Sequence, residues 1–189
     1  YLKKKGYPPL LINPSKIEPS NEISIDSNDS SQFLTGVLQA APIIRKFWNG
    51  PLVVKAVGLV SSRPYVDLTI KILKQFDIFV EEVEKNVFKI DSKRVISPNK
   101  IIVEGDASSA SYFLAAGALG QGPICIDGIG IKSIQGDIKL GNILKKMGAD
   151  VIFDDYRITI KSNKKLSGVK VDCRDIPDAA MVLVPCALY

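Results

Sequence analysis

Serine side chains gather where predicted strands give way to predicted helices. Ser30 and Ser31 stand at the start of one helical pattern, and Ser62 stands just before the next. The first N–H groups of a helix have no backbone acceptor and carry a partial positive charge, and serine hydroxyls add further donors. Several such starts on one side of a molecule would attract an anion such as a phosphate group. From spacing alone, these serines also fit plain helix caps, and one residue can serve both roles.

Few residue types in this chain can act as a general acid or base. The sequence contains no histidine, the commonest general base and metal ligand. A carboxylate is then the natural base, with lysine and tyrosine as alternatives. Asp178 is one candidate because it follows Pro177 at the start of a third helical pattern. The same position also suits an ordinary acidic residue that complements a helix dipole.

Two further groups near the middle of the chain are assigned structural roles. Glu104 and Asp106 form a closely spaced acid pair, which we interpret as part of a connection between domains rather than as a catalytic pair. Tyr112 and Phe113 fall in a helical pattern and are expected in the core.

The composition excludes several classes of protein. The chain has 189 residues, of which 46% are hydrophobic and 24% charged, as in globular proteins. The apolar run 179–189 is shorter than the roughly 20 residues of a membrane helix, so no membrane span is expected. The three cysteines show no CxxC spacing, which argues against a zinc site or a disulfide framework and favours the cytoplasm.

The distribution of charge favours a small anionic partner. Residues 1–102 hold 15 basic and 10 acidic side chains, whereas residues 103–189 hold 10 of each. This excess attracts anions. We expect no nucleic acid to bind, because no run of lysine and arginine is interleaved with aromatic residues.

Two stretches of the chain look like copies of one another, about 71 positions apart. Hydrophobic periodicity predicts the order strand, helix, strand, helix, strand, strand for each copy. In the first copy the expected elements are a strand at 23–26, a helix at 31–41 ended by Pro42, a strand at 52–57, a helix at 66–76, and strands at 78–80 and 87–90. In the second they are a strand at 101–103, a helix at 109–119, a strand at 124–126, a helix at 138–147, and strands at 150–153 and 157–160.

The rest of the chain fits parts of two more copies. Residues 1–22 are expected to be the tail of an earlier unit, with an edge strand at 10–12 between prolines. A further unit begins at 172. Repeated βαβαββ units indicate an α/β fold with helices packed on sheets. The chain begins without methionine and stops within an apolar helical pattern, so we expect it to be a piece of a longer protein.

The corners of these units resemble one enzyme family, the enolpyruvylshikimate phosphate synthases, also called 3-phosphoshikimate 1-carboxyvinyltransferases. The similar motifs occur in the family's order and span the chain: S-S-Q-F-L-T at 30–35, S-R-P-Y-V-D at 62–67, E-G-D-A-S-S-A-S-Y-F at 104–113 and I-P-D-A-A-M at 176–181. The resemblance implies an inside-out α/β barrel of repeated units. It places residues 1–102 in the shikimate 3-phosphate-binding domain, with a full unit at 23–102, and residues 103–189 in a second domain, with a full unit at 103–171 and the start of another at 172–189.

The resemblance also implies roles for individual residues. Ser30, Ser31 and Ser62 would bind shikimate 3-phosphate, mainly through its phosphoryl group. Gln32 would contact both this substrate and phosphoenolpyruvate, and Tyr65 would pack beside the shikimate ring. Asp178 would hold the ring hydroxyls and accept a proton. No metal or organic cofactor is implied, and a cytoplasmic monomer is expected.

The implied reaction moves the enolpyruvyl group of phosphoenolpyruvate to the 5-hydroxyl of shikimate 3-phosphate, in the shikimate pathway to chorismate and the aromatic amino acids, which glyphosate targets. Family members carry further segments that this chain lacks, including a Lys-Glu-x-x-Arg motif, so the chain alone should be inactive. Two alternatives stay open: the related transferase that acts on UDP-N-acetylglucosamine, and an inert module that binds phosphorylated ligands.

Overall fold

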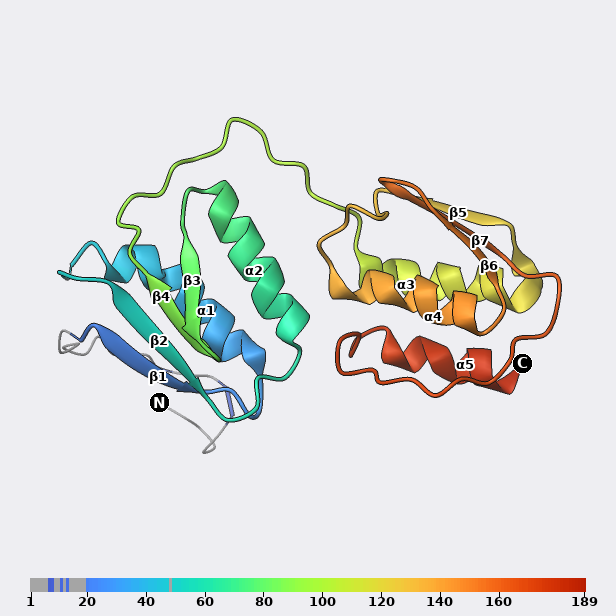
Figure 1. Cartoon of the computed structure of the whole chain (residues 1–189), viewed down its shortest axis with the longest axis horizontal. Coiled ribbons are helices and arrows are strands. Elements are labelled where there is room, and N and C mark those ends of the chain that lie inside the picture. Colours follow the sequence, from blue (N-terminus) through green and yellow to red (C-terminus); the bar gives the residue numbers. More distant parts are fainter. Residues whose placement is uncertain (1–6, 9–10, 12, 14–19, 48) are drawn as a thin grey trace.

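The chain folds around two separate sheets. The computed structural model describes residues 7–8, 11, 13, 20–47 and 49–189. Each sheet has its own hydrophobic core, and a long connection without helix or strand, residues 91–106, runs between them (Figure 1). The edge strand expected at 10–12 falls largely outside the described residues.

The first sheet has the predicted order of elements. It contains β1 (Glu22–Asp26), β2 (Leu52–Val57), β3 (Val80–Glu84) and β4 (Val87–Ile90), in the spatial order β1-β2-β4-β3. β1 and β2 are parallel, and the other pairs are antiparallel. Helix α1 (Ser31–Ile44) connects β1 to β2, and α2 (Arg63–Gln75) connects β2 to β3. The strand–helix–strand–helix–strand–strand prediction for this unit is therefore confirmed.

Hydrophobic periodicity explains why these elements form. Leu34, Leu38 and Ala41 recur at helical spacing in α1, and all three are buried in the first core. Residues of β2 alternate, so that Leu52 and Val54 point into the same core. The prediction that Pro42 ends the helix is wrong. Proline removes one N–H donor, but Arg45 N still donates to Ala41 O at 2.8 Å, so the last turn of α1 survives.

The second sheet repeats three of the four strands. It contains β5 (Ile124–Asp127), β6 (Asp150–Phe153) and β7 (Arg157–Lys161), in the antiparallel order β5-β7-β6. Helix α3 (Ala107–Ala116) precedes β5 and runs into a π-helical turn, η1 (Gly117–Gln121). A 3₁₀ turn, η2 (Gly136–Ile138), leads into α4 (Lys139–Lys146) between β5 and β6. A second 3₁₀ turn, η3 (Ala180–Val182), leads into α5 (Leu183–Leu188) near the end of the chain.

Several details of this unit differ from the sequence prediction. No strand forms at 101–103, and Ile102 and Val103 are 72% and 87% exposed. Local β propensity does not make a strand without a ladder partner, and here Gly105 N donates to Gly128 O at 2.9 Å beyond the end of β5. Tyr112 and Phe113 are exposed rather than in the core, because α3 turns its small residues toward the sheet. Similarly, β3 begins at Val80 instead of at residue 78.

Candidate functional site

The first serine corner joins β1 to α1. Ser30 has an extended backbone and caps α1, because its Oγ accepts a hydrogen bond from Gln32 N at 3.1 Å. Ser31 is the first residue of the helix and is only 5% exposed. Ser31 nevertheless lines a cavity described below. The capping role considered for Ser30 is thus confirmed, while capping alone does not explain Ser31.

The second serine corner joins β2 to α2 and has an unusual backbone. Ser62 lies in the left-handed region, with φ of 52° and ψ of 44°, and its side chain makes no capping hydrogen bond. A non-glycine residue in this region costs on the order of 1–3 kcal/mol, and such strain tends to persist at ligand sites. Pro64 fits the first turn of α2, where a missing N–H is tolerated. The hydroxyl of Ser62 is therefore free of a capping role and lines a cavity.

The two corners are tied together by the side chain of Asn28. Its Oδ1 accepts a hydrogen bond from Leu59 N at 3.0 Å, and Asp26 Oδ1 in turn accepts from Asn28 N and Nδ2, both at 2.9 Å. Gly58, with φ of +86°, allows the chain to pass this close to Asn28. The contact fixes the loop that carries Ser62 against the loop that carries Ser30.

We expect Gly58→Ala to destabilise the full-length protein by about 1–3 kcal/mol, because alanine is strained at positive φ. A Cβ atom there would also lie 2.3 Å from Asn28 Oδ1. Thermal unfolding of the purified variant measures the effect. Gly168→Ala is the matched control, since nothing lies within 4 Å of its Cβ position. Equal stability of the two variants would contradict the proposed contact between the corners.

The third corner lies in the second unit and faces the first two. Ile176 and Ala179 are buried in the second core and anchor this turn, whereas Asp178 is exposed. Tyr65, in the first turn of α2, reaches this turn: its hydroxyl lies 2.8 Å from Asp178 Oδ2 and 3.0 Å from Asp137 Oδ2. The phenol therefore connects the two units through two carboxylates.

The surroundings of Tyr65 keep its hydroxyl protonated. Burial raises the pKa of Tyr65 well above its usual value near 10, and the contacts with Asp178 and Asp137 raise the pKa further. At neutral pH the side chain is then a hydrogen-bond donor rather than a phenolate. Each neighbouring carboxylate can act as its acceptor.

The three corners enclose one cavity of about 320 Å³. All six residues singled out from the sequence contribute to its wall. The full lining is Asp29, Ser30, Ser31, Gln32, Thr35, Ser61, Ser62, Tyr65, Leu68, Thr69, Pro177 and Asp178. Hydroxyl groups dominate its polar wall, and this set contains no lysine or arginine. Such a wall suits a polyhydroxylated, phosphorylated molecule that binds through hydrogen bonds more than through ion pairs.

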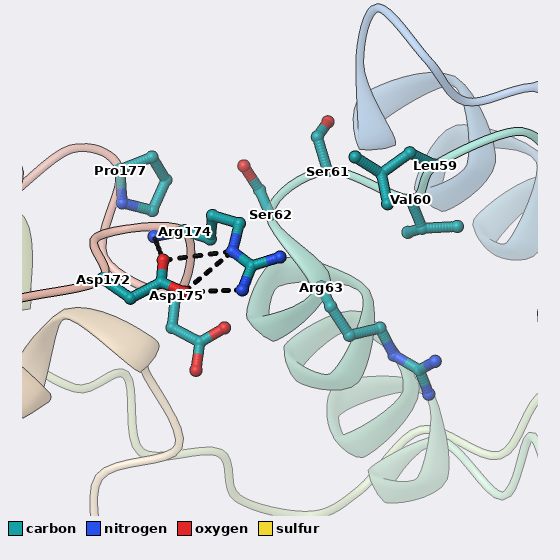
Figure 2. A pocket seen from close by; sticks show the side chains of 9 residues that line it. All are labelled: Leu59, Val60, Ser61, Ser62, Arg63, Asp172, Arg174, Asp175 and Pro177. Carbon is teal, nitrogen blue, oxygen red and sulfur yellow. Dashed lines mark hydrogen bonds and ion pairs between the residues drawn. The ribbon is translucent and has the colours of Figure 1, made fainter.

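A neighbouring cavity of about 540 Å³ shares Ser61, Ser62 and Pro177 with the first (Figure 2). It adds two arginines to the edge of the site. Arg63 is held by Asp67 at 2.8 Å and by Glu82 at 2.6 and 3.0 Å. Arg174 forms an ion pair with Asp172 at 2.6 Å and is largely exposed. Positive charge thus lies beside the serines, but it is paired with carboxylates.

The acid pair near residue 105 has the structural role expected for it. Asp106 caps α3 by accepting from the N–H groups of Ser108 and Ser109. Burial opposes ionisation of Glu104, but hydrogen bonds from Ser133, Gln135 and Ile134 N outweigh it and lower the pKa of this carboxyl. Neither residue lines the cavity between the corners.

Sequence reasoning missed several residues of the site. Asp29, Thr35, Ser61 and Thr69 line the cavity without having been singled out, although their neighbours were. Asp137 was missed entirely. It lies 72 positions after Tyr65, and no spacing pattern connects the two. Within the described residues, no group of three or more Cys, Asp and Glu side chains is arranged to hold a metal ion.

The fold of this chain is similar to the folds of two solved proteins. The structure matches that of the enolpyruvyl transferase NikO from Streptomyces tendae with a TM-score of 0.62 and 18% identity, over 88% of this chain and 41% of that one. It also matches an EPSP synthase from Acinetobacter baumannii, with a TM-score of 0.60 and 24% identity, over 84% of this chain and 36% of that one. At this level of identity the matches show the α/β fold that the repeats predicted.

The sequence shows the family to which the chain belongs. The family model for EPSP synthase (3-phosphoshikimate 1-carboxyvinyltransferase) matches residues 1–188, and the chain belongs to this family. All of the chain aligns with the 3-phosphoshikimate 1-carboxyvinyltransferases of Cupriavidus taiwanensis, at 41% identity, and Tolumonas auensis, at 44%. These matches cover 44% and 43% of the two relatives, so the chain spans less than half of their length. The resemblance stated from the four motifs is confirmed.

Proposed function

We propose that the protein carrying this chain transfers the enolpyruvyl group of phosphoenolpyruvate to the 5-hydroxyl of shikimate 3-phosphate and releases phosphate. The observation that carries this proposal is the single cavity lined by Ser30, Ser31, Gln32, Ser62, Tyr65 and Asp178, which come from both units. Membership of the EPSP synthase family supports this reaction over the transferase that acts on UDP-N-acetylglucosamine and over an inert binding module.

The serines are suited to the phosphoryl group of shikimate 3-phosphate. Ser30 and Ser31 lie at the N-terminus of α1, where free N–H groups and the helix dipole favour a negative charge. Ser62 faces the same cavity from the start of α2. Hydroxyl and N–H donors hold a dianion without a full countercharge, so binding is firm and still reversible. Gln32, next to these serines, is assigned contacts with both substrates.

Tyr65 and Asp178 are suited to the other end of the substrate. The ring of Tyr65 lies in the cavity wall and is assigned a place beside the shikimate ring. Asp178 is exposed next to the hydroxyl of Tyr65, where its carboxylate can hold ring hydroxyls and take the proton of the reacting 5-hydroxyl. Addition of that oxygen to C2 of phosphoenolpyruvate, with a proton delivered to C3, gives a tetrahedral intermediate. Loss of phosphate from C2 together with a proton from C3 restores the double bond. The partner acid for these steps is expected among residues outside this chain.

The remaining properties of the protein are predictions of the same proposal. We place the domain boundary near residue 103, within the connection between the two sheets. The two substrates are the proposed partners, and no metal or organic cofactor is assigned. A monomer located in the cytoplasm is proposed. Among the helices of the described residues, none is both long and apolar enough to cross a membrane.

The full-length protein is expected to release phosphate from phosphoenolpyruvate only when shikimate 3-phosphate is present. The chain alone is expected to show no measurable release, because most contacts to phosphoenolpyruvate and the partner acid are assigned to other segments. A phosphate-release assay tests both, with host enzyme removed from the preparation. Turnover by the chain alone would mean that the chemistry has been placed in the wrong residues.

A further inference from the structure

Asp137 is a buried acid that the proposed reaction does not use. It lies in η2, is 4% exposed, and its Oδ1 makes no hydrogen bond with the described residues. Its Oδ2 accepts a hydrogen bond from Ser108 Oγ at 2.6 Å and lies 3.0 Å from Tyr65 Oη. A buried carboxylate with an unsatisfied oxygen is costly, so its presence in this place calls for a reason.

Asp137 interacts through hydroxyl groups and not through cations. Two basic residues close in sequence to Asp137 and Tyr65 pair with other carboxylates. Lys139, two residues after Asp137, pairs with Asp175 at 2.6 Å, and Arg63, two residues before Tyr65, pairs with Asp67 and Glu82. No ion pair recorded among the described residues includes Asp137. Its main contact outside its own unit is therefore the hydroxyl of Tyr65.

The hydroxyl of Tyr65 has one proton and two carboxylate neighbours. Since a phenol donates a single hydrogen bond, it serves either Asp178 or Asp137 fully, but not both. Under the proposed function, shikimate 3-phosphate places its ring hydroxyls against Asp178. Tyr65 must then give up that acceptor inside a partly buried site, where an unpaired donor is costly.

We propose that Asp137 is a positioning residue for Tyr65. Its carboxylate is the second acceptor, which keeps the phenol in place and hydrogen-bonded when the substrate occupies Asp178. This inference rests on the proposed function, because it needs a ligand at Asp178. The buried carboxylate then serves to keep an acceptor ready on the far side of Tyr65, with Ser108 fixing its orientation.

The test is a double-mutant cycle in the full-length protein, with the dissociation constant of shikimate 3-phosphate measured by calorimetry. Asp137→Leu removes both acceptor oxygens at a similar side-chain size, and it is expected to weaken binding about tenfold, the coupling typical of two side chains joined by a hydrogen bond. In a Tyr65→Phe background the same change should alter binding by less than about twofold. Equal losses in the two backgrounds would show that Asp137 acts only on the fold, and would overturn the inference.

Asp127→Leu is the matched control, since it makes the same replacement at an exposed acid that pairs with Arg157 and lines neither cavity of the site. It should leave binding within about twofold of the unchanged protein, and a loss as large as that of Asp137→Leu would overturn the inference. Failure of the unchanged protein to bind shikimate 3-phosphate would remove the proposed function as well. If the unchanged protein binds shikimate 3-phosphate but the losses in the double-mutant cycle simply add, only the role of Asp137 is ruled out.

A structure of the full-length protein with shikimate 3-phosphate gives a second readout that needs no variant. We expect Tyr65 Oη to remain within hydrogen-bond distance of Asp137 Oδ2, while Asp178 faces the ligand. A phenol that leaves Asp137 when the ligand binds would overturn the inference, even if Asp137→Leu fails to fold.

Discussion

Replacing Asp178 by asparagine in the full-length protein is expected to lower the turnover rate by about 100- to 10,000-fold, the usual contribution of general acid–base catalysis. Asparagine keeps the size of the side chain, and its Oδ1 can still accept a hydrogen bond from Tyr65. It cannot take the proton of the 5-hydroxyl. Because Asp178 is exposed, stability should change by no more than about 0.5 kcal/mol. Steady-state phosphate release and thermal unfolding measure the two quantities.

Asp175→Asn is the matched control for this variant. Asp175 belongs to the same turn but lines the neighbouring cavity and pairs with Lys139. It should retain activity within about twofold, since an exposed ion pair contributes little. If Asp178→Asn instead keeps more than about half of the activity, Asp178 has no part in the proton transfer.

Removing either serine hydroxyl is expected to weaken the binding of shikimate 3-phosphate. Ser31→Ala and Ser62→Ala should each lose roughly 1.5–3 kcal/mol, the range for a hydrogen bond to a charged group. Both residues line one cavity, so both are expected to address the same phosphoryl group. Calorimetric titration of each purified full-length variant measures the loss.

The two serine variants also predict a coupling. In the double variant the losses should not simply add, because both side chains act on one charge. Ser24→Ala, on an exposed position of β1, is the control and should leave affinity unchanged. Fully additive losses, or losses no larger than that of the control, would return Ser31 and Ser62 to a structural role.

The sequence predicted the elements of the fold better than their boundaries. Periodicity identified α1 and β2 because their apolar faces reach a core at every turn or every second residue. It placed a strand at 101–103, where the residue types are right but no neighbouring strand provides a ladder. Similarly, Pro42 has a weak effect because it lies in the last turn of α1. Strand pairing and helix ends depend on tertiary contacts that local patterns do not contain.

The candidate site likewise contains residues that could be predicted from the sequence and residues that could not. The corner residues could be predicted because serine, proline and aspartate at helix starts have a local signature, and because the motifs resemble a family. Asp137 could not be predicted, since its place in the site depends on contacts with Tyr65 and Ser108, which are both distant in sequence. The strained backbone of Ser62 could not be predicted either, because a serine in the sequence does not indicate a positive φ.

The serines of the first two corners are proposed to bind the phosphoryl group of shikimate 3-phosphate. Titrating the full-length protein with shikimate 3-phosphate and with shikimate tests this central claim most directly, because the two ligands differ only in that group. We predict that the phosphorylated ligand binds at least about a hundredfold more tightly, as two or more hydrogen bonds to a charged group require. Equal affinity for the two ligands would contradict the claim.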